Sequence, residues 1–224
     1  MSGFAWCAAA GVFAAAFLLG SIPWGVIVSR LFYKRDLRNY GSGNIGTTNA
    51  MRTLGKVGGA AVFVLDFGKG LLSGVLGWAV AQWLLAGPEA LSPYQVVSVM
   101  TATAFLGCTY GHIFSPWLGF KGGKGIAVAI GCLFVTFGVV GALAEIAVFA
   151  VLVLTTRYVS VGSIASGIAC PLIAIAPFHG CPFAWACCLV VGVTVVWAHR
   201  ANIGRLRKGT ESRIGSKKKD ASVS

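Results

Sequence analysis

The segment from Tyr40 to Arg52 combines closely spaced glycines with short polar side chains and an arginine. Such glycines let backbone N–H groups converge on an anion, and Arg52 could add a bidentate contact to phosphate. The spacing fits neither a Walker A loop nor a dinucleotide-binding fingerprint. We therefore predict an anion-binding loop of another kind. Its candidate residues are Gly41, Ser42, Gly43, Asn44, Gly46, Thr47 and Asn49.

A second segment places two lysines around a pair of glycines. Backbone donors, a predicted helix start and two ammonium groups would together favour an anion. Lysines reaching towards a membrane surface are the alternative explanation. His112, just upstream, could instead cap a helix or satisfy a buried group. The candidates in this segment are Lys121, Gly122, Gly123, Lys124 and Gly125.

Two polar segments follow later in the chain. The first spans 155–163 and includes Ser160 and Ser163, although an ordinary helix turn with a serine cap explains it almost as well. The second spans 199–211, where a basic membrane anchor would explain the arginines but not the other polar residues. Its candidates are His199, Asn202, Arg205 and Glu211.

Asp66 and Lys69 lie three residues apart within an apolar stretch. At that spacing they share a helix face and can form an ion pair. Ionisable groups at membrane depth are costly and usually functional. Because pairing lowers the cost, a structural tether and a direct chemical role both remain open.

The elements that must position these residues are predicted to be transmembrane helices. The chain has 224 residues, of which 57% are hydrophobic and 11% charged, against about 25% charged in soluble domains. This excludes a soluble enzyme, a disordered chain and a coiled coil. Residues 125–156 could form one long helix or a hairpin of two short ones. The predicted spans are 4–30, 57–86, 94–112, 125–140, 141–156, 161–178 and 182–199.

The location of the charges predicts the topology. The net charge is +12, and all lysines and arginines except Lys69 fall between or after the predicted spans. With seven spans and an outside N-terminus, they all face the cytoplasm, as the positive-inside rule requires. Gly141, with Glu145 just beyond it, would then mark the outer turn of the short hairpin. The fold class is thus all-α, with a cytoplasmic C-terminus.

The same pattern predicts one transmembrane domain over 1–213 and a basic tail over 214–224. No separate basic domain is available for nucleic acid. No CxxC motif or cysteine–histidine cluster has zinc spacing, so no metal site is predicted.

In order along the chain, the segments 41–49, 111–125 and 199–206 resemble the three motifs of the PlsY family, the bacterial acyl-phosphate:glycerol-3-phosphate acyltransferases. Tyr158-Val159-Ser160 and the Asp66 to Gly70 segment also resemble that family. Thr47 departs from it, because the family more often has alanine there. The likeness covers nearly the whole chain.

The resemblance implies a seven-helix, multi-pass enzyme of the bacterial inner membrane with its active site on the cytoplasmic side. It would move a fatty acyl group from acyl phosphate to the 1-hydroxyl of sn-glycerol 3-phosphate, giving lysophosphatidic acid and phosphate. Its partners would be these two substrates and membrane lipid. It would need no metal, cofactor, coenzyme A or carrier protein, and we expect a monomer.

The resemblance also implies roles for the residues. Ser42, Gly43 and Asn44 would hold the acyl phosphate. Arg52, with Lys121 or Lys124, would hold the phosphate of glycerol 3-phosphate. Hydroxyl groups would be positioned by Ser160 or Ser163, His199 and Asn202, and Glu211 would order the arginine-rich end.

The general base stays open between His112, His199 and a phosphate oxygen of the acyl phosphate. We favour the phosphate oxygen, because the resemblance suggests it and the sequence shows no histidine–carboxylate dyad. The residues five after each histidine are Trp117, Ala184 and Gly204, which excludes the acyltransferases that use a His-x4-Asp pair.

An organic-phosphate transporter with cytoplasmic anion sites is the alternative function. It would need anion sites near the membrane midplane and often has inverted repeats. No repeat is evident, and the predicted motifs lie at one surface. The enzyme hypothesis requires all four polar segments to meet at that surface.

Overall fold

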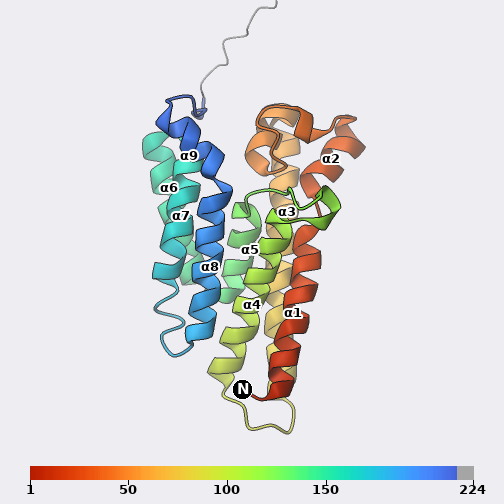
Figure 1. Cartoon of the computed structure of the whole chain (residues 1–224), viewed down its shortest axis with the longest axis vertical. Helices are drawn as coiled ribbons and strands as arrows, with labels where there is room; N and C mark the ends of the chain where they lie inside the picture. Colours follow the sequence, from red (N-terminus) through yellow and green to blue (C-terminus); the bar gives the residue numbers. More distant parts are fainter. Residues whose placement is uncertain (216–224) are drawn as a thin grey trace, which may run out of the picture.

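The computed structural model of the chain describes residues 1–215. These residues form a bundle of long helices lying roughly side by side (Figure 1). From residue 216 onward, the predicted basic tail lies outside the described residues. In chain order the elements are α1 (Gly3–Ser21), α2 (Trp24–Tyr33), η1 (Leu37–Asn39), α3 (Thr47–Leu85), α4 (Pro93–Ile113), η2 (Pro116–Leu118), α5 (Ile126–Thr136), α6 (Gly138–Thr156), α7 (Val159–Ile173), α8 (Pro182–Ala198) and α9 (Arg200–Arg207).

Within the described residues, four helical stretches are long and apolar enough to cross a membrane. They are Gly3–Tyr33, Thr47–Leu85, Pro93–Leu118 and Gly138–Thr156. The pair α8 and α9, bent by 50°, adds a fifth if it counts as one span, and α5 and α7 are apolar but shorter. The outer surface exposes large apolar side chains such as Phe32, Val57, Leu154 and Leu172. An apolar exterior of this kind suits contact with lipid.

The first two predicted spans have different boundaries in the structure. Residues 4–30 do not form one helix, because α1 ends at Ser21 and α2 begins after Pro23. Proline lacks the N–H that a continuous helix needs and clashes with the preceding turn. The second helix begins at Thr47 rather than at 57, with a kink at Gly55, where φ is +80°. The segment predicted to bind an anion therefore ends inside a helix.

Residues 125–156 form two helices rather than one. The break lies at Phe137 and Gly138, where Gly138 has a φ of +70°. Glycine adopts this left-handed conformation without the cost of a Cβ. The predicted turn at Gly141 was wrong, because Gly141 lies inside α6. In Figure 1, α5 leads away from the end of the bundle that carries α9, and α6 returns to it.

Close helix packing is made possible by glycines that face a neighbouring backbone. A Cβ at Gly111 of α4 would lie 2.0 Å from the Phe17 carbonyl oxygen of α1. A Cβ at Gly131 of α5 would lie 2.0 Å from the Phe67 carbonyl oxygen of α3. Small residues at helix contacts are typical of membrane bundles. Helix α4, most of whose side chains are buried, lies at the centre of this packing.

The polar segments gather at the end of the bundle opposite the N-terminus. In Figure 1 this end carries the α2–α3 connection, the loop between η2 and α5, and α9. The break after α1 sends α2 outward here, and the bend after α8 turns α9 across the bundle. These interruptions in the long helices create the framework of the site.

Candidate active site

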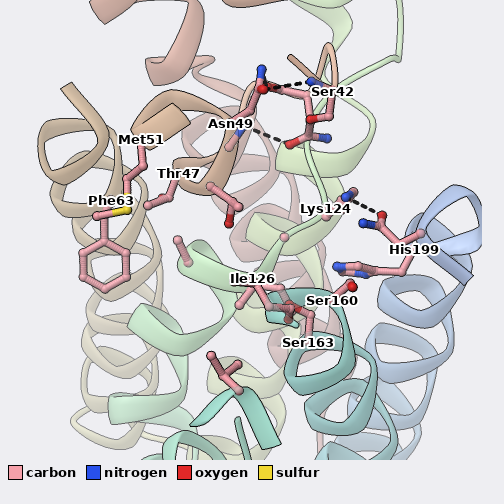
Figure 2. Close-up of a pocket in the computed structure, with 18 of the residues that line it drawn as sticks. Ser42, Thr47, Asn49, Met51, Phe63, Lys124, Ile126, Ser160, Ser163 and His199 are labelled. Atoms are coloured by element: carbon pink, nitrogen blue, oxygen red, sulfur yellow. Dashed lines mark hydrogen bonds between the residues drawn. The ribbon is translucent and has the colours of Figure 1, made fainter. Parts of the chain in front are cut away.

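All four polar segments line one cavity at this end of the bundle. The cavity has a volume of about 340 Å³. Figure 2 shows Ser42, Lys124, Ser160 and His199 around it. The prediction that distant polar segments meet at one end is therefore confirmed. The polar lining comprises Ser42, Asn44, Gly46, Thr47, Thr48, Asn49, Arg52, Asp66, His112, Lys124, Gly125, Ser160, Ser163, His199, Asn202, Arg205 and Glu211.

An adjoining cavity of about 370 Å³ is lined by both lysines of the second motif. Lys124 lines both cavities, whereas Lys121 lines only the adjoining one. Gly41 lines neither. The adjoining cavity is also formed by Gly43, Gly122, Gly123 and Arg200, and it shares Ser42, Asn44, Asn202 and Arg205 with the first.

The Asn49 side chain holds the first loop together. Its Oδ1 accepts a 2.9 Å hydrogen bond from the Ser42 N–H. Its Nδ2 donates to three carbonyl oxygens, at 3.2 Å to Leu37, 3.0 Å to Tyr40 and 2.9 Å to Asn44. The side chain is almost fully buried. Both ends of this amide are engaged within the loop, which supports a positioning role for Asn49, and its contact with substrate stays a prediction.

Other backbone donors of the loop are also used internally. The Gly43 N–H donates to the Tyr40 carbonyl oxygen at 3.0 Å, and the Gly46 N–H donates to Asn44 Oδ1 at 2.9 Å. The predicted nest of converging N–H groups is therefore wrong at these positions. The glycines instead allow tight turns, since Gly41 and Gly43 have φ values of +60° and +69°.

The donors available to an anion lie at the start of α3. Within the described residues, the Thr47 and Thr48 N–H groups make no backbone hydrogen bond, and the buried Thr47 Oγ1 has no partner. The first turn of a helix attracts negative charge through such unpaired N–H groups and the helix dipole. Arg52 lies on the same helix and also lines the cavity. A phosphate at the start of α3 would therefore meet backbone donors and a guanidinium.

The glycine pair of the second motif serves close packing. A Cβ at Gly122 would lie 2.0 Å from the His112 carbonyl oxygen, and one at Gly123 would lie 2.0 Å from His112 Nε2. Their N–H groups donate to the carbonyl oxygens of Ile113 and His112 at 2.9 and 3.0 Å. The prediction that these two N–H groups bind an anion was wrong. They fix the loop against α4, and the loop carries Lys124 to the cavity.

Four side chains form a hydrogen-bonded chain across the site. Lys124 Nζ donates to Asn202 Oδ1 at 2.5 Å, and Asn202 Nδ2 donates to Glu211 Oε1 at 2.7 Å. Arg205 Nε donates to the other carboxylate oxygen, Glu211 Oε2, at 2.6 Å. Glu211 is almost buried, with 6% of its side chain exposed. The carboxylate therefore fixes the orientation of both the amide and the guanidinium.

Charge and burial shift the pKa values of two of these hydrogen-bonded side chains, Lys124 and Glu211. Burial, together with the positive charges of Arg205 and Arg52, lowers the pKa of Lys124 to about 8 against the opposing effect of Glu211. Burial alone would raise the pKa of Glu211, but hydrogen bonds from Asn202 and Arg205 outweigh it and hold that pKa below its usual value. The site thus contains an excess of positive charge that a dianion would neutralise.

The two histidines of the motifs differ in the ring nitrogen they present. His199 Nδ1 lies 2.8 Å from the Val195 carbonyl oxygen and must donate to it, which leaves Nε2 as an acceptor. His112 Nδ1 lies 3.0 Å from Lys69 Nζ and accepts from that ammonium, which places the ring proton on Nε2 against Gly123. His199 is therefore the histidine with an acceptor nitrogen free for a substrate hydroxyl.

Asp66, Lys69 and His112 form a buried polar cluster, of which Asp66 and His112 also line the cavity. Lys69 Nζ lies 2.8 Å from Asp66 Oδ1 and donates to the Ile22 carbonyl oxygen at 2.7 Å. His112 Nδ1 lies 3.7 Å from Asp66 Oδ1. The cluster ties α3 and α4 to the break after α1, which favours the tether over the direct chemical role. It also contains a histidine–carboxylate pair that sequence analysis missed.

Ser160 and Ser163, near the start of α7, differ in whether their hydroxyl groups are already hydrogen-bonded within the protein. Ser163 Oγ donates to the Val159 carbonyl oxygen at 2.9 Å. The buried Ser160 Oγ makes no hydrogen bond of standard geometry within the described residues, although it lies close enough to Glu211 to lower the pKa of that carboxyl. Ser160 therefore has the hydroxyl group that is available to a ligand.

Part of the cavity wall is apolar. Helices α3, α5, α6 and α7 each contribute hydrophobic side chains to it. A ligand spanning the cavity would therefore need a polar, anionic end and an apolar body. The apolar lining includes Met51, Phe63, Ile126, Ala127, Ile130, Phe149, Val153 and Val159.

The cavity thus combines cationic side chains, unpaired N–H groups at the start of α3 and an apolar wall. Comparisons with known proteins show the family to which a site of this composition belongs. A family model described as glycerol-3-phosphate acyltransferase matches residues 10–209. The chain belongs to this family, PlsY. It is 40% identical to the glycerol-3-phosphate acyltransferase of Rhodospirillum rubrum, over 96% of this chain and 93% of the relative. It is 38% identical to that of Maricaulis maris, over 94% and 89%.

Solved structures of PlsY, an integral membrane glycerol 3-phosphate acyltransferase, have the same fold. The glycerol 3-phosphate form matches with a TM-score of 0.78 and 36% identity, covering 93% of this chain and 96% of that one. The lysophosphatidic acid form matches with a TM-score of 0.74 and 35% identity over the same shares. This chain is accordingly an integral membrane enzyme of the PlsY family.

Sequence analysis also missed the contribution of Arg213 and Ile214, which follow Glu211. The Ile214 N–H donates to the Arg157 carbonyl oxygen at 2.8 Å, and the Arg157 guanidinium donates back to the Ile214 carbonyl oxygen at 2.9 Å. Arg213 Nε donates to the Tyr158 hydroxyl at 2.8 Å. These bonds hold the segment across the α6–α7 turn, so that Ile214 lines the cavity. Ile214 was predicted to begin a tail, and its sequence carries no signal of this contact.

Proposed function

We propose that this enzyme transfers a fatty acyl group from acyl phosphate to the 1-hydroxyl of sn-glycerol 3-phosphate. The products are lysophosphatidic acid and inorganic phosphate. The observation that carries the proposal is that one cavity is lined both by cationic and hydrogen-bonding groups and by apolar side chains. Both substrates carry phosphate, and only the donor carries a long apolar chain. One cavity of this composition can bind both substrates, with the phosphate groups at the cationic side chains and the acyl chain at the apolar ones.

The geometry supports a division of roles. Arg52 and Lys124 hold the phosphate of glycerol 3-phosphate, because they line the same cavity, whereas Lys121 does not reach it. The acyl phosphate binds beside Ser42 and Asn44 at the free N–H groups that begin α3. The acyl chain then extends between the apolar side chains of α5, α6 and α7.

The glycerol hydroxyl is positioned by the chain of groups that begins at Lys124. His199 Nε2 accepts a hydrogen bond from a hydroxyl, and Asn202 and Ser160 fix the glycerol backbone. Glu211 acts through Asn202 and Arg205, to which it is hydrogen-bonded. Preorganised donors at the developing charge contribute strongly to catalysis.

In the reaction, the glycerol 1-hydroxyl oxygen forms a bond to the acyl carbonyl carbon. The bond from that carbon to the phosphate oxygen breaks, and phosphate leaves with the electron pair. The hydroxyl proton passes to an oxygen of the departing phosphate. This route needs no protein base, and the histidine–carboxylate pair at His112 supplies none, because His112 Nδ1 is occupied by Lys69.

The proposed setting is the bacterial inner membrane, with α5 and α7 crossing as well as the longer helices. Seven crossings with the N-terminus outside place the cavity on the cytoplasmic side. The lysines and arginines clustered at that end agree with the positive-inside rule. Glycerol 3-phosphate would reach the cavity from water and the acyl phosphate from the bilayer.

The test is turnover by purified protein with palmitoyl phosphate and glycerol 3-phosphate in the presence of a metal chelator. We expect release of phosphate and formation of lysophosphatidate. Turnover with palmitoyl-coenzyme A but not with palmitoyl phosphate would overturn the donor assignment. Arg52→Ala should mainly raise the KM for glycerol 3-phosphate. Lys56→Ala, an exposed cation on α3 outside the cavity, is the matched control.

A further inference from the structure

A small cavity of about 30 Å³ lies within the bundle beside the active-site cavity. Ile126 and Ile130 of α5 line both cavities, so the two are neighbours. Its wall is otherwise apolar except for Glu145 of α6 and Ser166 of α7. No step of the proposed reaction uses either residue.

Two further helices connect the cavities along one face. On α6, Val153 and Phe149 line the active-site cavity, and Glu145, four residues from Phe149, lines the small one. On α7, Ser163 lines the active-site cavity and Ser166 the small one. Residues three and four apart share a helix face. The apolar slot therefore continues along α6 for about 12 Å from Val153 to Glu145.

The two polar groups of the small cavity are not satisfied by the protein. Glu145 is 2% exposed, and its Oε1 has no hydrogen-bond partner within the described residues. Ser166 Oγ is likewise buried and unpartnered in that part of the chain. A buried polar group without a partner is costly, and an ionisable group at membrane depth is usually functional. Packing alone would have been served by an apolar residue at either position.

We infer that the small cavity receives the far end of the donor's saturated acyl chain and that Glu145 and Ser166 form a polar floor that limits its length. The inference rests on the proposed function, because it assigns the acyl chain to the apolar slot. A chain that ends before the floor leaves room for a water molecule, which needs a cavity of at least about 10–15 Å³. That water can bond to both polar groups.

A longer chain must displace this water with methylene groups. The methylene groups cannot accept or donate hydrogen bonds, so Glu145 and Ser166 lose their partner. Leaving one such group unpaired weakens binding by about tenfold or more. The loss offsets the gain from burying the additional carbons. The polar floor thus disfavours longer acyl chains both because they do not fit and because they leave Glu145 and Ser166 without a hydrogen-bond partner.

The test compares kcat/KM for myristoyl, palmitoyl and stearoyl phosphate in each variant. Glu145→Met removes the polar group while keeping an unbranched side chain of similar length, and Glu145→Gln keeps the polarity. We expect Glu145→Met to raise the stearoyl-to-myristoyl ratio at least fivefold and Glu145→Gln to leave the ratio within twofold of wild type. Ser166→Ala should give a smaller increase. Leu154→Ala, an exposed position on α6 outside both cavities, is the matched control.

A ratio of kcat/KM values within one variant does not depend on how much active protein is recovered. If Glu145→Met does not fold, Ile130→Phe, which narrows the passage between the cavities, should lower the stearoyl-to-myristoyl ratio instead. Unchanged ratios in the folded Glu145 and Ser166 variants would overturn the inference, as would an equal increase in Glu145→Gln. Wild-type turnover of acyl phosphate is measured in the same assay, so failure of the proposed function is recognised separately.

Discussion

Lys124 Nζ donates a 2.5 Å hydrogen bond to Asn202 Oδ1, which joins the loop before α5 to α9 across 78 residues of sequence. The opposite side of that amide donates to Glu211. The carboxylate thereby turns the amide oxygen towards the lysine. The position of the cation in the cavity depends on an acidic residue with which it shares no hydrogen bond.

The ionisation of Lys124 predicts a pH dependence. Its pKa is about 8 in the ligand-free protein, so the side chain is charged below that pH and neutral above it. Because the charged form binds phosphate, we expect the KM for glycerol 3-phosphate to be lowest near pH 7 and about twice as high at pH 8, where half of the side chain is neutral. Above pH 8 the KM should rise, approaching about tenfold per pH unit. Initial rates across this range measure it. Lys124→Arg stays charged, and a KM that rises equally in that variant would exclude Lys124 as the titrating group.

Replacement of His199 distinguishes orientation from base catalysis. We expect His199→Ala to lower kcat/KM by about tenfold, because it removes one hydrogen bond to the glycerol while the departing phosphate still takes the proton. General acid–base catalysis contributes about 10²–10⁴-fold. Steady-state rates with both substrates varied measure the effect. A loss of about 10³-fold or more would identify His199 as the base.

Gly123 and His112 should be energetically coupled. A methyl group at Gly123 would meet His112 Nε2 at 2.0 Å, so Gly123→Ala should displace the Lys124 loop and raise the KM for glycerol 3-phosphate. His112→Ala makes room for the methyl group. In a double-mutant cycle on thermal unfolding in detergent, we expect a coupling of about 1 kcal/mol or more. Gly68→Ala, where the methyl group would meet open space, is the control. Additive effects would show that the two residues do not clash.

Lys69 is expected to matter for stability. Lys69→Met leaves Asp66 and His112 buried without their shared partner. Removing one member of a buried ion pair costs about 3–5 kcal/mol. Denaturant unfolding in detergent measures the loss, with Lys56→Met as the exposed control. Adding Asp66→Leu to Lys69→Met should recover much of the loss, since it removes the uncompensated charge. A Lys69→Met protein as stable as wild type would contradict the tether.

The positions of the helices could be predicted from the sequence because long apolar stretches separated by basic residues are a strong signal. Their ends were less predictable. Composition does not distinguish Gly138, which adopts a φ of +70°, from Gly141, which lies inside α6. Likewise, Pro23 lies within the first apolar stretch, and its effect on the helix became evident only in the structure.

The residue types of the site were predicted better than their roles. Asn49 and Gly122 lie in the anticipated segments, but their polar groups serve the protein's own loops. A sequence lists donors without showing which ones the fold uses. The cluster around Lys69 was missed for the same reason, since it joins residues from separate helices to the carbonyl oxygen of Ile22.

The hydrogen bonds between Ile214 and Arg157 have a consequence for biosynthesis. Glu211 and Ile214 complete the cavity wall, yet they follow every apolar helix of the described chain. A nascent polypeptide that has been synthesised only through α8 still lacks the carboxylate that is hydrogen-bonded to Asn202, which in turn accepts from Lys124. We therefore expect the active-site cavity to be completed only after translation has passed Ile214.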